Sequence, residues 1–295
     1  MKLGLLVEAE EGLTWQRWRR LAQAADELGL DSLWISDHLA SAWEPQRHGL
    51  DAWMALAFAA VETSQVRLGT LVSPVTFRPP SILARMAESV WERSQGRLVV
   101  GLGLGWNAQE HAAAGLAFPG VEERVQRLEQ SIRAVRNTLG ERRVEVLVGG
   151  GGARTLGVAA RHADEWNLTT NDPAAFVARA AVLDTECESI ARRPHEIRRS
   201  IATGVLVGRD RREIEQRSLR MQACVPPLSG VSVAAVPEAA RAQGWVAGTV
   251  DEVAEQLAAF EAAGVQRAML GLYDLDDLTS IEIIAREVGP RVQCT

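Results

Sequence analysis

The sequence contains few cysteines, and their scarcity excludes two kinds of site. The three cysteines, Cys187, Cys224 and Cys294, stand far apart along 295 residues and are odd in number. Neither a zinc site nor a disulfide framework fits that spacing. The formal net charge of -6 argues against a nucleic-acid partner, because such proteins carry a basic stripe.

Long hydrophobic runs are missing as well. The longest covers residues 52–61, well short of the roughly 18 residues that a membrane-spanning helix needs. Near the N-terminus the apolar residues 3–7 give way to Glu8, Glu10 and Glu11, whereas a secretory leader has a longer apolar stretch without acids. We therefore expect a cytoplasmic protein with no membrane partner.

Three catalytic signatures are absent from the chain. It contains no HExxH, no cluster of Asp and His with ligand spacing and no GxSxG. Metal-dependent hydrolysis and nucleophile-elbow chemistry therefore have no support, and we expect no metal.

What the sequence does contain is a regular alternation of short apolar runs and amphipathic stretches. Strands are predicted at 2–7, 32–35, 66–72, 97–104, 144–148, 165–168, 197–207 and 265–272. Helices are predicted at 15–28, 52–62, 79–94, 121–139, 155–162, 173–192, 210–221, 249–263 and 278–288. Strands that are apolar on both faces, such as LVVGLGL, are typical of a parallel sheet covered by helices. Eight strand–helix units predict an α/β fold with one domain over residues 1–295, a (β/α)8 TIM barrel.

The alternation is interrupted once. Residues 225–244, between the seventh and eighth strands, are rich in Pro, Gly, Ser and Ala and show no strand–helix unit. We interpret this segment as an insertion over one end of the barrel and as a candidate lid.

Polar and aromatic residues stand at the C-terminal ends of two strands, where barrel enzymes carry their function. The second strand ends in Asp37 and His38, and histidine suits proton transfer because its pKa lies near neutrality. His38 is therefore a candidate catalytic residue, although Asp37 could instead cap a turn while His38 packs. The sixth strand carries Trp166, which either walls an aromatic ligand or belongs to the core.

Glycines occupy the end of the fourth strand and follow the fifth. In GLGLG at 101–105 they let a flat ligand or a second backbone approach, or they simply fit the taper of the barrel. The run Gly149, Gly150, Gly151 and Gly152 opens a helix that continues with Arg154 and Thr155. Backbone N–H groups and the helix dipole at this point predict a phosphate cradle.

Taken together, these strand ends resemble a known family. The resemblance rests on SDHL at 36–39, LGTLVSPVTFRPP at 68–80, GRLVVGLGLGWNAQEHAAAGLAFP at 96–119, GGGGARTLGVAARHADEWN at 149–167 and GTVDEVAEQLAAFEAAGV at 248–265. The combination and order of these motifs resemble the luciferase-like monooxygenase superfamily, and within it the oxidoreductases that use the deazaflavin coenzyme F420. The similarity covers residues 2–273, and residues 225–244 match least.

The resemblance implies a homodimeric enzyme that holds the ring of its cofactor at the mouth of the barrel. The ring would lie beside Asp37 and His38, and a non-prolyl cis peptide, expected at Leu71 and Val72, would support it from behind. The ring pocket would be completed by Leu104, Gly105 and Trp106, and the glycine loop would follow the phosphate-bearing tail.

One position departs from the pattern of the family. The sugar-phosphate dehydrogenases of this branch carry Glu where this chain has Trp106, which argues against glucose 6-phosphate as the substrate. The resemblance and this departure together suggest an apolar or aromatic substrate wall made by Trp43, Trp106 and Trp166.

Three functions stay open at this point. The first is an F420-dependent oxidoreductase, in which His38 supplies or removes the proton that accompanies hydride transfer. The second is an FMN-dependent monooxygenase that receives reduced flavin from a partner reductase. The third is a flavin-binding protein without catalytic activity.

Overall fold

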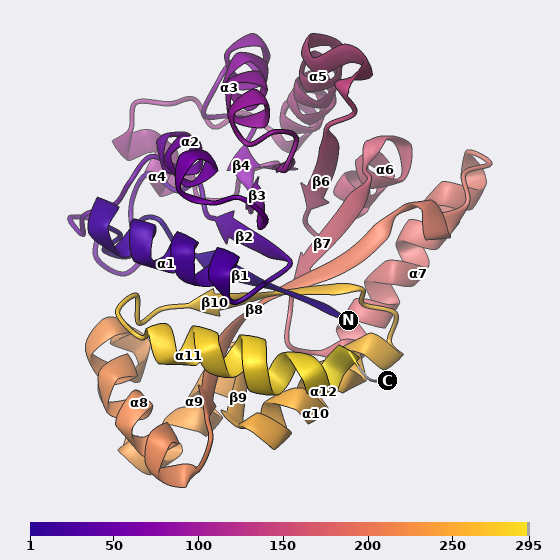
Figure 1. Cartoon of the computed structure of the whole chain (residues 1–295). Helices are drawn as coiled ribbons and strands as arrows, with labels where there is room; N and C mark the ends of the chain where they lie inside the picture. The colour runs from indigo at the N-terminus through magenta and orange to yellow at the C-terminus, as the bar shows by residue number, and fades with distance from the viewer. Residues whose placement is uncertain (294–295) are drawn as a thin grey trace.

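Residues 1–293, which the computed structural model describes, contain a closed barrel of eight parallel strands surrounded by helices (Figure 1). The barrel strands are β1 (Lys2–Val7), β2 (Ser32–Ile35), β3 (Arg67–Thr70), β5 (Leu98–Gly103), β6 (Glu145–Gly149), β7 (Glu165–Thr169), β8 (Arg198–Gly208) and β10 (Arg267–Leu272). β10 pairs with both β1 and β8, which closes the ring. The predicted TIM barrel is thus confirmed. Cys294 lies outside the described residues.

The helices form the outer layer of the barrel. They are α1 (Trp15–Glu27), α2 (Ala52–Glu62), α3 (Pro80–Arg93), α4 (Ala108–Ala113), α5 (Val121–Leu139), α6 (Ala153–His162), α7 (Pro173–Ser189), α8 (Arg211–Cys224), α9 (Val236–Ala242), α10 (Val250–Ala262), α11 (Leu278–Ile283) and α12 (Gly289–Gln293). A π-helical turn, Ile284–Val288, joins α11 to α12. Met1 lies beside α12, where its ammonium group donates to the Val292 carbonyl at 2.8 Å. Figure 1 shows β1 and α12 near each other.

Local signals set several helix ends. The Thr14 side chain accepts from the Arg17 N–H, and Gly29 follows α1 with φ of +71°. Thr249 and Glu252 form a reciprocal capping box at the start of α10. These short-range interactions explain why the predicted helix positions agree with the structure.

The third barrel strand differs from the prediction. The strand expected at 66–72 ends at Thr70, the Leu71–Val72 peptide is cis, and a short strand β4 (Ser73–Pro74) then pairs with β5. The cis peptide that the resemblance implied at Leu71 and Val72 is therefore present.

The elements that were not predicted include two short ones, α4 and β9. α4 is only six residues long and is capped by Asn107, whose side chain accepts from two backbone N–H groups. β9 (Val246–Thr249) directly precedes α10 and pairs with the outer half of β8, beyond the part of β8 that belongs to the barrel. α4 lies shortly before α5, and β9 lies directly before α10. The sequence pattern of each short element therefore cannot be distinguished from that of the longer helix that follows it.

The interior of the barrel is packed with side chains. Leu6, Trp34, Val99, Leu147, Ala202 and Met269 form this inner cluster, against which Leu71 and Val72 pack. A larger cluster fills the space between the strands and the helices. The inner cluster therefore forms a solid floor beneath the C-terminal mouth.

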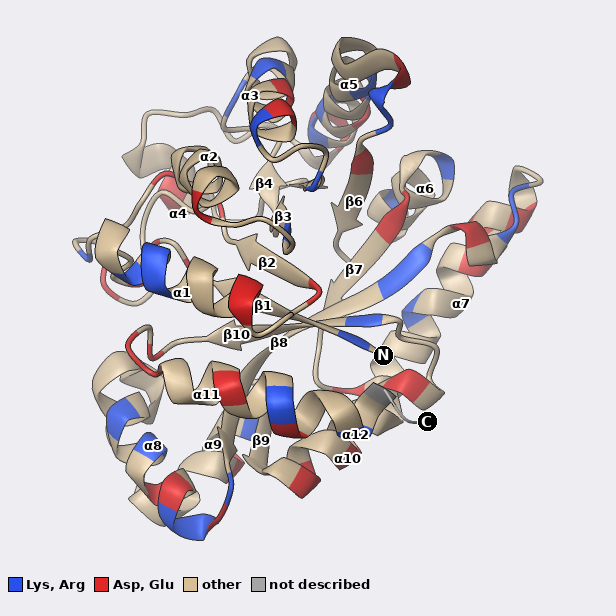
Figure 2. Cartoon of the chain, in the orientation of Figure 1, with Lys and Arg blue, Asp and Glu red and all other residues tan. Residues whose placement is uncertain are grey.

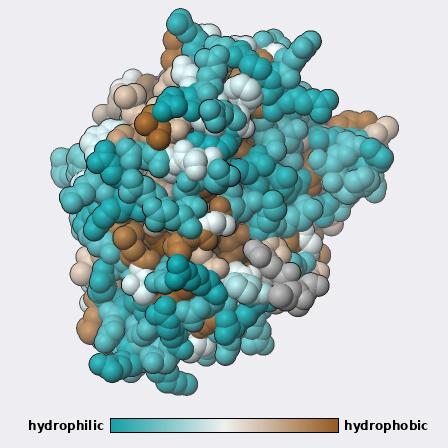
Figure 3. All heavy atoms as spheres, in the orientation of Figure 1, coloured by the Kyte–Doolittle hydropathy of each residue, from teal (hydrophilic) through white to brown (hydrophobic). Residues whose placement is uncertain are grey.

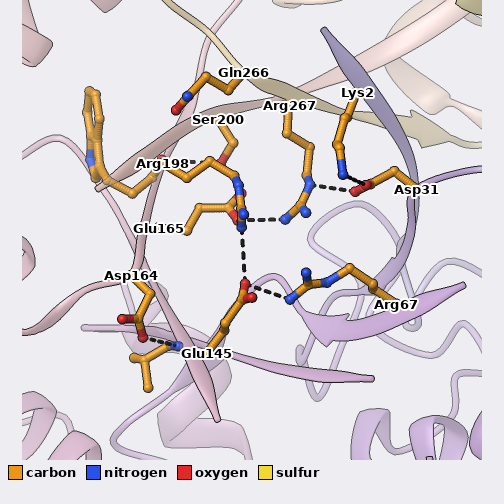
Figure 4. A network of polar contacts seen from close by, with 12 residues as sticks. Lys2, Asp31, Arg67, Glu145, Asp164, Glu165, Arg198, Ser200, Gln266 and Arg267 are labelled. Carbon is orange, nitrogen blue, oxygen red and sulfur yellow. Dashed lines mark hydrogen bonds and ion pairs between the residues drawn. The ribbon is translucent and has the colours of Figure 1, made fainter. Parts of the chain in front are cut away.

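The N-terminal end of the barrel is closed by a network of charges (Figure 4). Arg267 on β10 is fully buried and pairs with Glu165 at 2.6 Å and with Asp31 at 2.7 Å. Arg198 bridges Glu165 and Glu145 at 3.2 and 3.1 Å. The network continues to Lys2 and Arg67 and so connects strands from opposite sides of the ring.

Residues 225–244 form two 3₁₀ turns (Pro226–Leu228 and Val233–Ala235) and α9. They share a separate apolar cluster with α8, β9 and the outer half of β8, and its largest buried side chain is Trp245. The predicted insertion is thus an ordered layer beside the mouth, and its action as a lid stays a prediction.

The surface shows both signs of charge. Lys and Arg are interspersed with Asp and Glu over the helices in this view (Figure 2). The same face is mostly hydrophilic, with apolar side chains gathered along the seam between α1 and α11 (Figure 3). No helix within residues 1–293 is long and apolar enough to cross a bilayer.

Candidate active site

A cavity of about 460 Å³ opens at the C-terminal ends of the barrel strands. Its lining comes from the ends of β1, β2, β3, β5, β6, β7, β8 and β10, and comprises Leu6, Glu8, His38, Leu71, Val72, Pro74, Gly103, Leu104, Gly105, Trp106, Gly149, Gly150, Gly151, Gly152, Thr155, Asn167, Thr169, Ala202, Thr203, Gly204, Gly271 and Tyr273. Most of the predicted site residues thus meet in one place.

One wall of the cavity is apolar and depends on glycine. A Cβ atom on Gly103 would lie 2.5 Å from Val72 Cγ2, and one on Gly149 would lie 2.8 Å from Val72 Cγ1. A Cβ on Gly101 would overlap the Thr70 carbonyl oxygen. The glycines of β5 therefore serve close approach of the neighbouring strand, and they let Leu71 and Val72 protrude into the mouth.

His38 stands at a polar end of the cavity and is held by Glu110 on α4. Its Nδ1 lies 3.0 and 3.2 Å from the two carboxylate oxygens of Glu110. The same carboxylate accepts from the backbone N–H groups of Leu39 and Ala40. The ring of Trp106, which is 68% exposed, meets the imidazole edge-on at 5.7 Å. Glu110 and Trp106 therefore hold the imidazole ring of His38 in position from two sides.

Two further carboxyl groups, Glu8 and Glu10, follow β1 on the other side of His38. The Ser36 hydroxyl donates to Glu10 at 2.5 Å. Burial raises the pKa of Glu8, and it raises the pKa of Glu10 to about 8, to which the neighbouring Glu8 also contributes. Burial alone would lower the pKa of His38, but the hydrogen bond with Glu110 and the nearby Glu10 outweigh it and raise that pKa to about 9.

Asp37 lies on the opposite side of its strand from the cavity. It pairs with Arg78 at 2.6 Å and accepts from the Ser73 hydroxyl at 2.6 Å, and it is almost fully buried. Burial raises its pKa while Arg78 opposes that effect. Asp37 thus ties β2 to the segment after β3, and the structure brings His38, but not Asp37, to the cavity lining.

The glycine loop ends at the N-terminus of α6. Gly150 has φ of +125° and donates its N–H to the Asn167 carbonyl at 3.0 Å. Gly152 occupies the N-cap position of α6 without a side-chain cap, and Thr155 lines the cavity. Arg154 instead points outward and pairs with Glu122 on α5. The loop therefore offers backbone N–H groups and one hydroxyl to a ligand.

Of the three tryptophans proposed for the substrate wall, Trp106 lines the cavity, and Trp43 and Trp166 lie behind it. Trp166 is fully buried, stacks on Phe176 at 5.3 Å and donates to the Gly150 carbonyl at 2.9 Å. It belongs to the outer core, because its neighbour Asn167 is the residue that faces the cavity. The structure thus corrects the placement of Trp166 in the wall.

Trp43 is one layer away from the cavity. Its ring centroid lies 5.6 Å from that of Tyr273, which lines the cavity and stacks on Trp245 at 4.5 Å. Trp43 therefore reaches the site through Tyr273.

Several lining residues were missed by the sequence reasoning. Glu8 belongs to the acidic group after the first strand, which served only as evidence against a leader, and Tyr273 is the single tyrosine, placed directly after the last strand. Glu8 and Tyr273 each stand directly after a predicted strand, and this position could have identified them as candidate site residues. Glu110 carried none, because it contacts His38 across 72 positions of the sequence.

Comparison with known proteins agrees with this architecture. The family described as luciferase-like monooxygenase matches residues 1–267 of the chain. The chain belongs to that family. Among residues 1–293 there is no group of His, Cys, Asp and Glu that could hold a metal ion.

Two curated relatives match part of the chain. An F420-dependent glucose-6-phosphate dehydrogenase of Kineococcus radiotolerans is 34% identical over 145 residues, which cover 49% of this chain and 42% of that protein. An F420-dependent hydroxymycolic acid dehydrogenase of Mycobacterium tuberculosis is 26% identical over 201 residues, covering 58% and 56%. The chain thus spans about half the length of these relatives.

Solved structures match almost the whole chain. An F420-dependent secondary alcohol dehydrogenase in complex with an F420-acetone adduct superposes with a TM-score of 0.81 at 18% identity, covering 99% of this chain and 98% of that one. A long-chain alkane monooxygenase superposes with a TM-score of 0.79 at 14% identity, covering 100% and 91%. At these identities the likeness shows the fold.

Proposed function

We propose that the protein is an oxidoreductase that binds coenzyme F420 at the mouth of its barrel and transfers hydride between it and a small organic substrate. The observation that carries this proposal is one cavity with three different surfaces: an apolar wall at Val72, a glycine loop leading into an uncapped helix, and His38 at a polar end. The F420 dependence named for both curated relatives supports it.

The residues present fit a tricyclic ring with a phosphate-bearing tail. Val72 can take its place in the cavity wall only because Gly103 and Gly149, against which it packs, lack side chains. Leu104 and Leu71 would cover the ring, and the α6 N-terminus with Thr155 would hold a phosphate group. A bound deazaflavin supplies the hydride chemistry, and the protein supplies position and the proton at His38.

FMN is the alternative cofactor, since it shares the tricyclic ring and the ribityl phosphate and would suit a monooxygenase. We therefore propose a fluorescence-quench titration of the purified protein with F420 and, in parallel, with FMN. Tight binding of F420 and weak binding of FMN supports the proposal, and the reverse replaces it with the monooxygenase. If F420 binds but no substrate changes its redox state, the protein is a carrier.

Two variants test the phosphate cradle in the same titration. Thr155→Val removes the one hydroxyl of the loop that faces the cavity and should weaken binding about tenfold, the value of one hydrogen bond to a charged group. Arg154→Gln is the matched control, since that side chain pairs with Glu122. A larger loss for Arg154→Gln would show that the guanidinium turns inward when the cofactor binds.

We also propose that the protein is a homodimer, supported by the outer face of α2. Met54 and Val61 on this face are 60% and 56% exposed, and Trp15 and Ile82 extend the apolar surface onto α1 and α3. Light scattering should give twice the mass of the chain. Met54→Glu combined with Val61→Glu should convert it to a monomer, whereas an unchanged mass would place the interface elsewhere.

A separate reductase that recycles the cofactor and a location in the cytoplasm complete the proposal. Cys187 and Cys224 are both free, which suits a reducing compartment. Cell fractionation tests the location, and turnover with catalytic amounts of F420 tests the need for a recycling enzyme.

A further inference from the structure

The loop that carries Trp106 runs from β5 to α4 along the edge of the cavity. Leu104, Gly105 and Trp106 all line the cavity, but the Trp106 side chain is 68% exposed and is therefore not held by burial. Gly105 has φ of +75°, a left-handed conformation that favours glycine. The position of this loop therefore depends on contacts to its backbone.

Arg124 on α5 fixes the residue that precedes Trp106. Its Nη1 donates to the Gly105 carbonyl at 2.5 Å, and its guanidinium carbon lies 4.2 Å from the centroid of the Phe118 ring. Arg124 is not among the described residues that line the cavity. Its influence on a ligand there therefore passes through the loop.

His111 on α4 fixes the residue that follows Trp106. Its Nδ1 donates to the Asn107 carbonyl at 2.7 Å, and its Nε2 lies 2.6 Å from the hydroxyl oxygen of Thr76. The His111 ring is buried and contacts the ring of Phe118 at 4.7 Å, so the same phenylalanine packs beside both fixing residues. The exposed tryptophan thus stands between two backbone positions that are held from behind.

The contact of Arg124 with the loop is not explained by the stability of the barrel. Arg124 Nε is buried without a hydrogen-bond partner among residues 1–293, and such a donor lowers stability. α5 is attached to the barrel by other side chains, among them the fully buried Leu128 and Ile132. What the contact holds is the loop with Leu104 and Trp106, and a loop that is ordered before binding loses less entropy when a ligand arrives.

We propose that Arg124 is a positioning residue for cofactor binding, which through the Gly105 carbonyl holds Leu104 and Trp106 where they cover the ring of the cofactor. The inference rests on the proposed F420 function. If the loop without Arg124 occupies the binding position only about a tenth of the time, the apparent dissociation constant rises about tenfold, because only that fraction of the protein can bind. Arg124 thus acts on affinity without contacting the cofactor.

The first test follows Trp106 in the protein without cofactor, by fluorine NMR after labelling with 5-fluorotryptophan. Trp106→Phe assigns the resonance among the nine tryptophans. In Arg124→Met this resonance should move toward its position in the urea-unfolded protein, because the loop leaves its place beside His38. Arg127→Met is the matched control, since Arg127 pairs with Glu123 one turn before it on α5, and it should leave the resonance unchanged. A resonance that does not respond to Arg124→Met overturns the proposal.

The second test is the F420 titration of the same variants, at a temperature where thermal unfolding shows each of them to be folded. Arg124→Met should bind F420 about tenfold more weakly than the wild type. Arg124→Lys keeps a donor for the Gly105 carbonyl and should recover most of the affinity, and Arg127→Met should match the wild type. Equal affinities for Arg124→Met and Arg127→Met contradict the proposal.

A third comparison separates positioning from direct contact with the cofactor. In a Leu104→Ala/Trp106→Ala background the loop has lost the side chains that cover the ring, so adding Arg124→Met should weaken F420 binding less than about twofold. A full further tenfold loss in this background would show that Arg124 acts on the cofactor itself, which overturns the proposal.

These measurements separate the inference from the function on which it rests. Tight F420 binding that Arg124→Met leaves unchanged keeps the proposed function and removes the inference. Failure of the wild-type protein to bind F420 removes both, whatever the resonance of Trp106 shows.

Discussion

Replacing Arg267 by methionine should destabilise the barrel without changing ligand binding. Arg267 is fully buried and supplies partners to Glu165 and Asp31, at 2.6 and 2.7 Å (Figure 4). Methionine would leave the fully buried Glu165 with Arg198 alone, at 3.2 Å. Removing one partner of a buried ion pair costs about 3–5 kcal/mol, because the remaining charge is poorly compensated. We expect a loss of about 3 kcal/mol, or about 6 °C in Tm.

The assay is urea unfolding followed by tryptophan fluorescence, for which the chain provides nine tryptophans. Lys2→Met is the matched control, since Lys2 pairs with the same Asp31 at 2.9 Å but is 62% exposed. Its loss should stay within about 1 kcal/mol. F420 binding should persist in both variants at low temperature, because the network lies at the opposite end of the barrel from the cavity.

A second substitution tests whether the unpaired charge of Glu165 causes the loss of stability. Glu165→Gln in the Arg267→Met background removes the uncompensated charge, so the double variant should be more stable than Arg267→Met alone. Equal losses for Arg267→Met and Lys2→Met, or a double variant as weak as the sum of the single ones, would refute the account of the network.

Three further predictions concern other parts of the chain. Gly150→Ala should lower stability by about 1–2 kcal/mol and weaken F420 binding, because φ of +125° strains any L-residue there; unchanged melting and binding would contradict this. Trp245→Ala should release residues 225–244 to limited proteolysis, since its ring stacks on Tyr273, and an unchanged cleavage rate would count against that anchoring. Burial would raise the pKa of Asp26, but three backbone N–H groups outweigh it and lower that pKa, so its stabilisation is present above the usual aspartate pKa and is lost as the pH falls through the lowered one. Asp26→Ala should therefore cost about 1–2 kcal/mol at pH 7 and much less in acid, as urea unfolding at both pH values would show.

The order of strands and helices could be predicted because its signals are local. Strands are short runs that are apolar on both faces, helices carry apolar residues at helical spacing, and Thr14, Gly29 and the Thr249–Glu252 pair mark helix ends within a few residues. Closure into a barrel brings the strand ends together, so His38 and Gly149 could be expected at the same end of the barrel from their positions, whereas Leu71 was assigned there by the family resemblance.

Contacts that depend on closure could not be predicted. Glu110 holds His38 across 72 positions, and neither residue carries a local mark of the other. Which face of a strand points inward depends on its register: Asn167 lines the cavity, whereas its neighbour Trp166 packs against Phe176.

The sequence by itself determined the barrel, its strand ends and the position of His38, because periodicity and capping act over one or two turns of chain. Only the tertiary structure decided the direction in which the pKa of His38 is shifted: burial lowers that pKa, and the hydrogen bond with Glu110, together with the nearby Glu10 and Glu8, outweighs burial and raises it. It also decided the fit of Val72 against Gly149, which requires two strands to pack closely enough that a single Cβ atom would separate them.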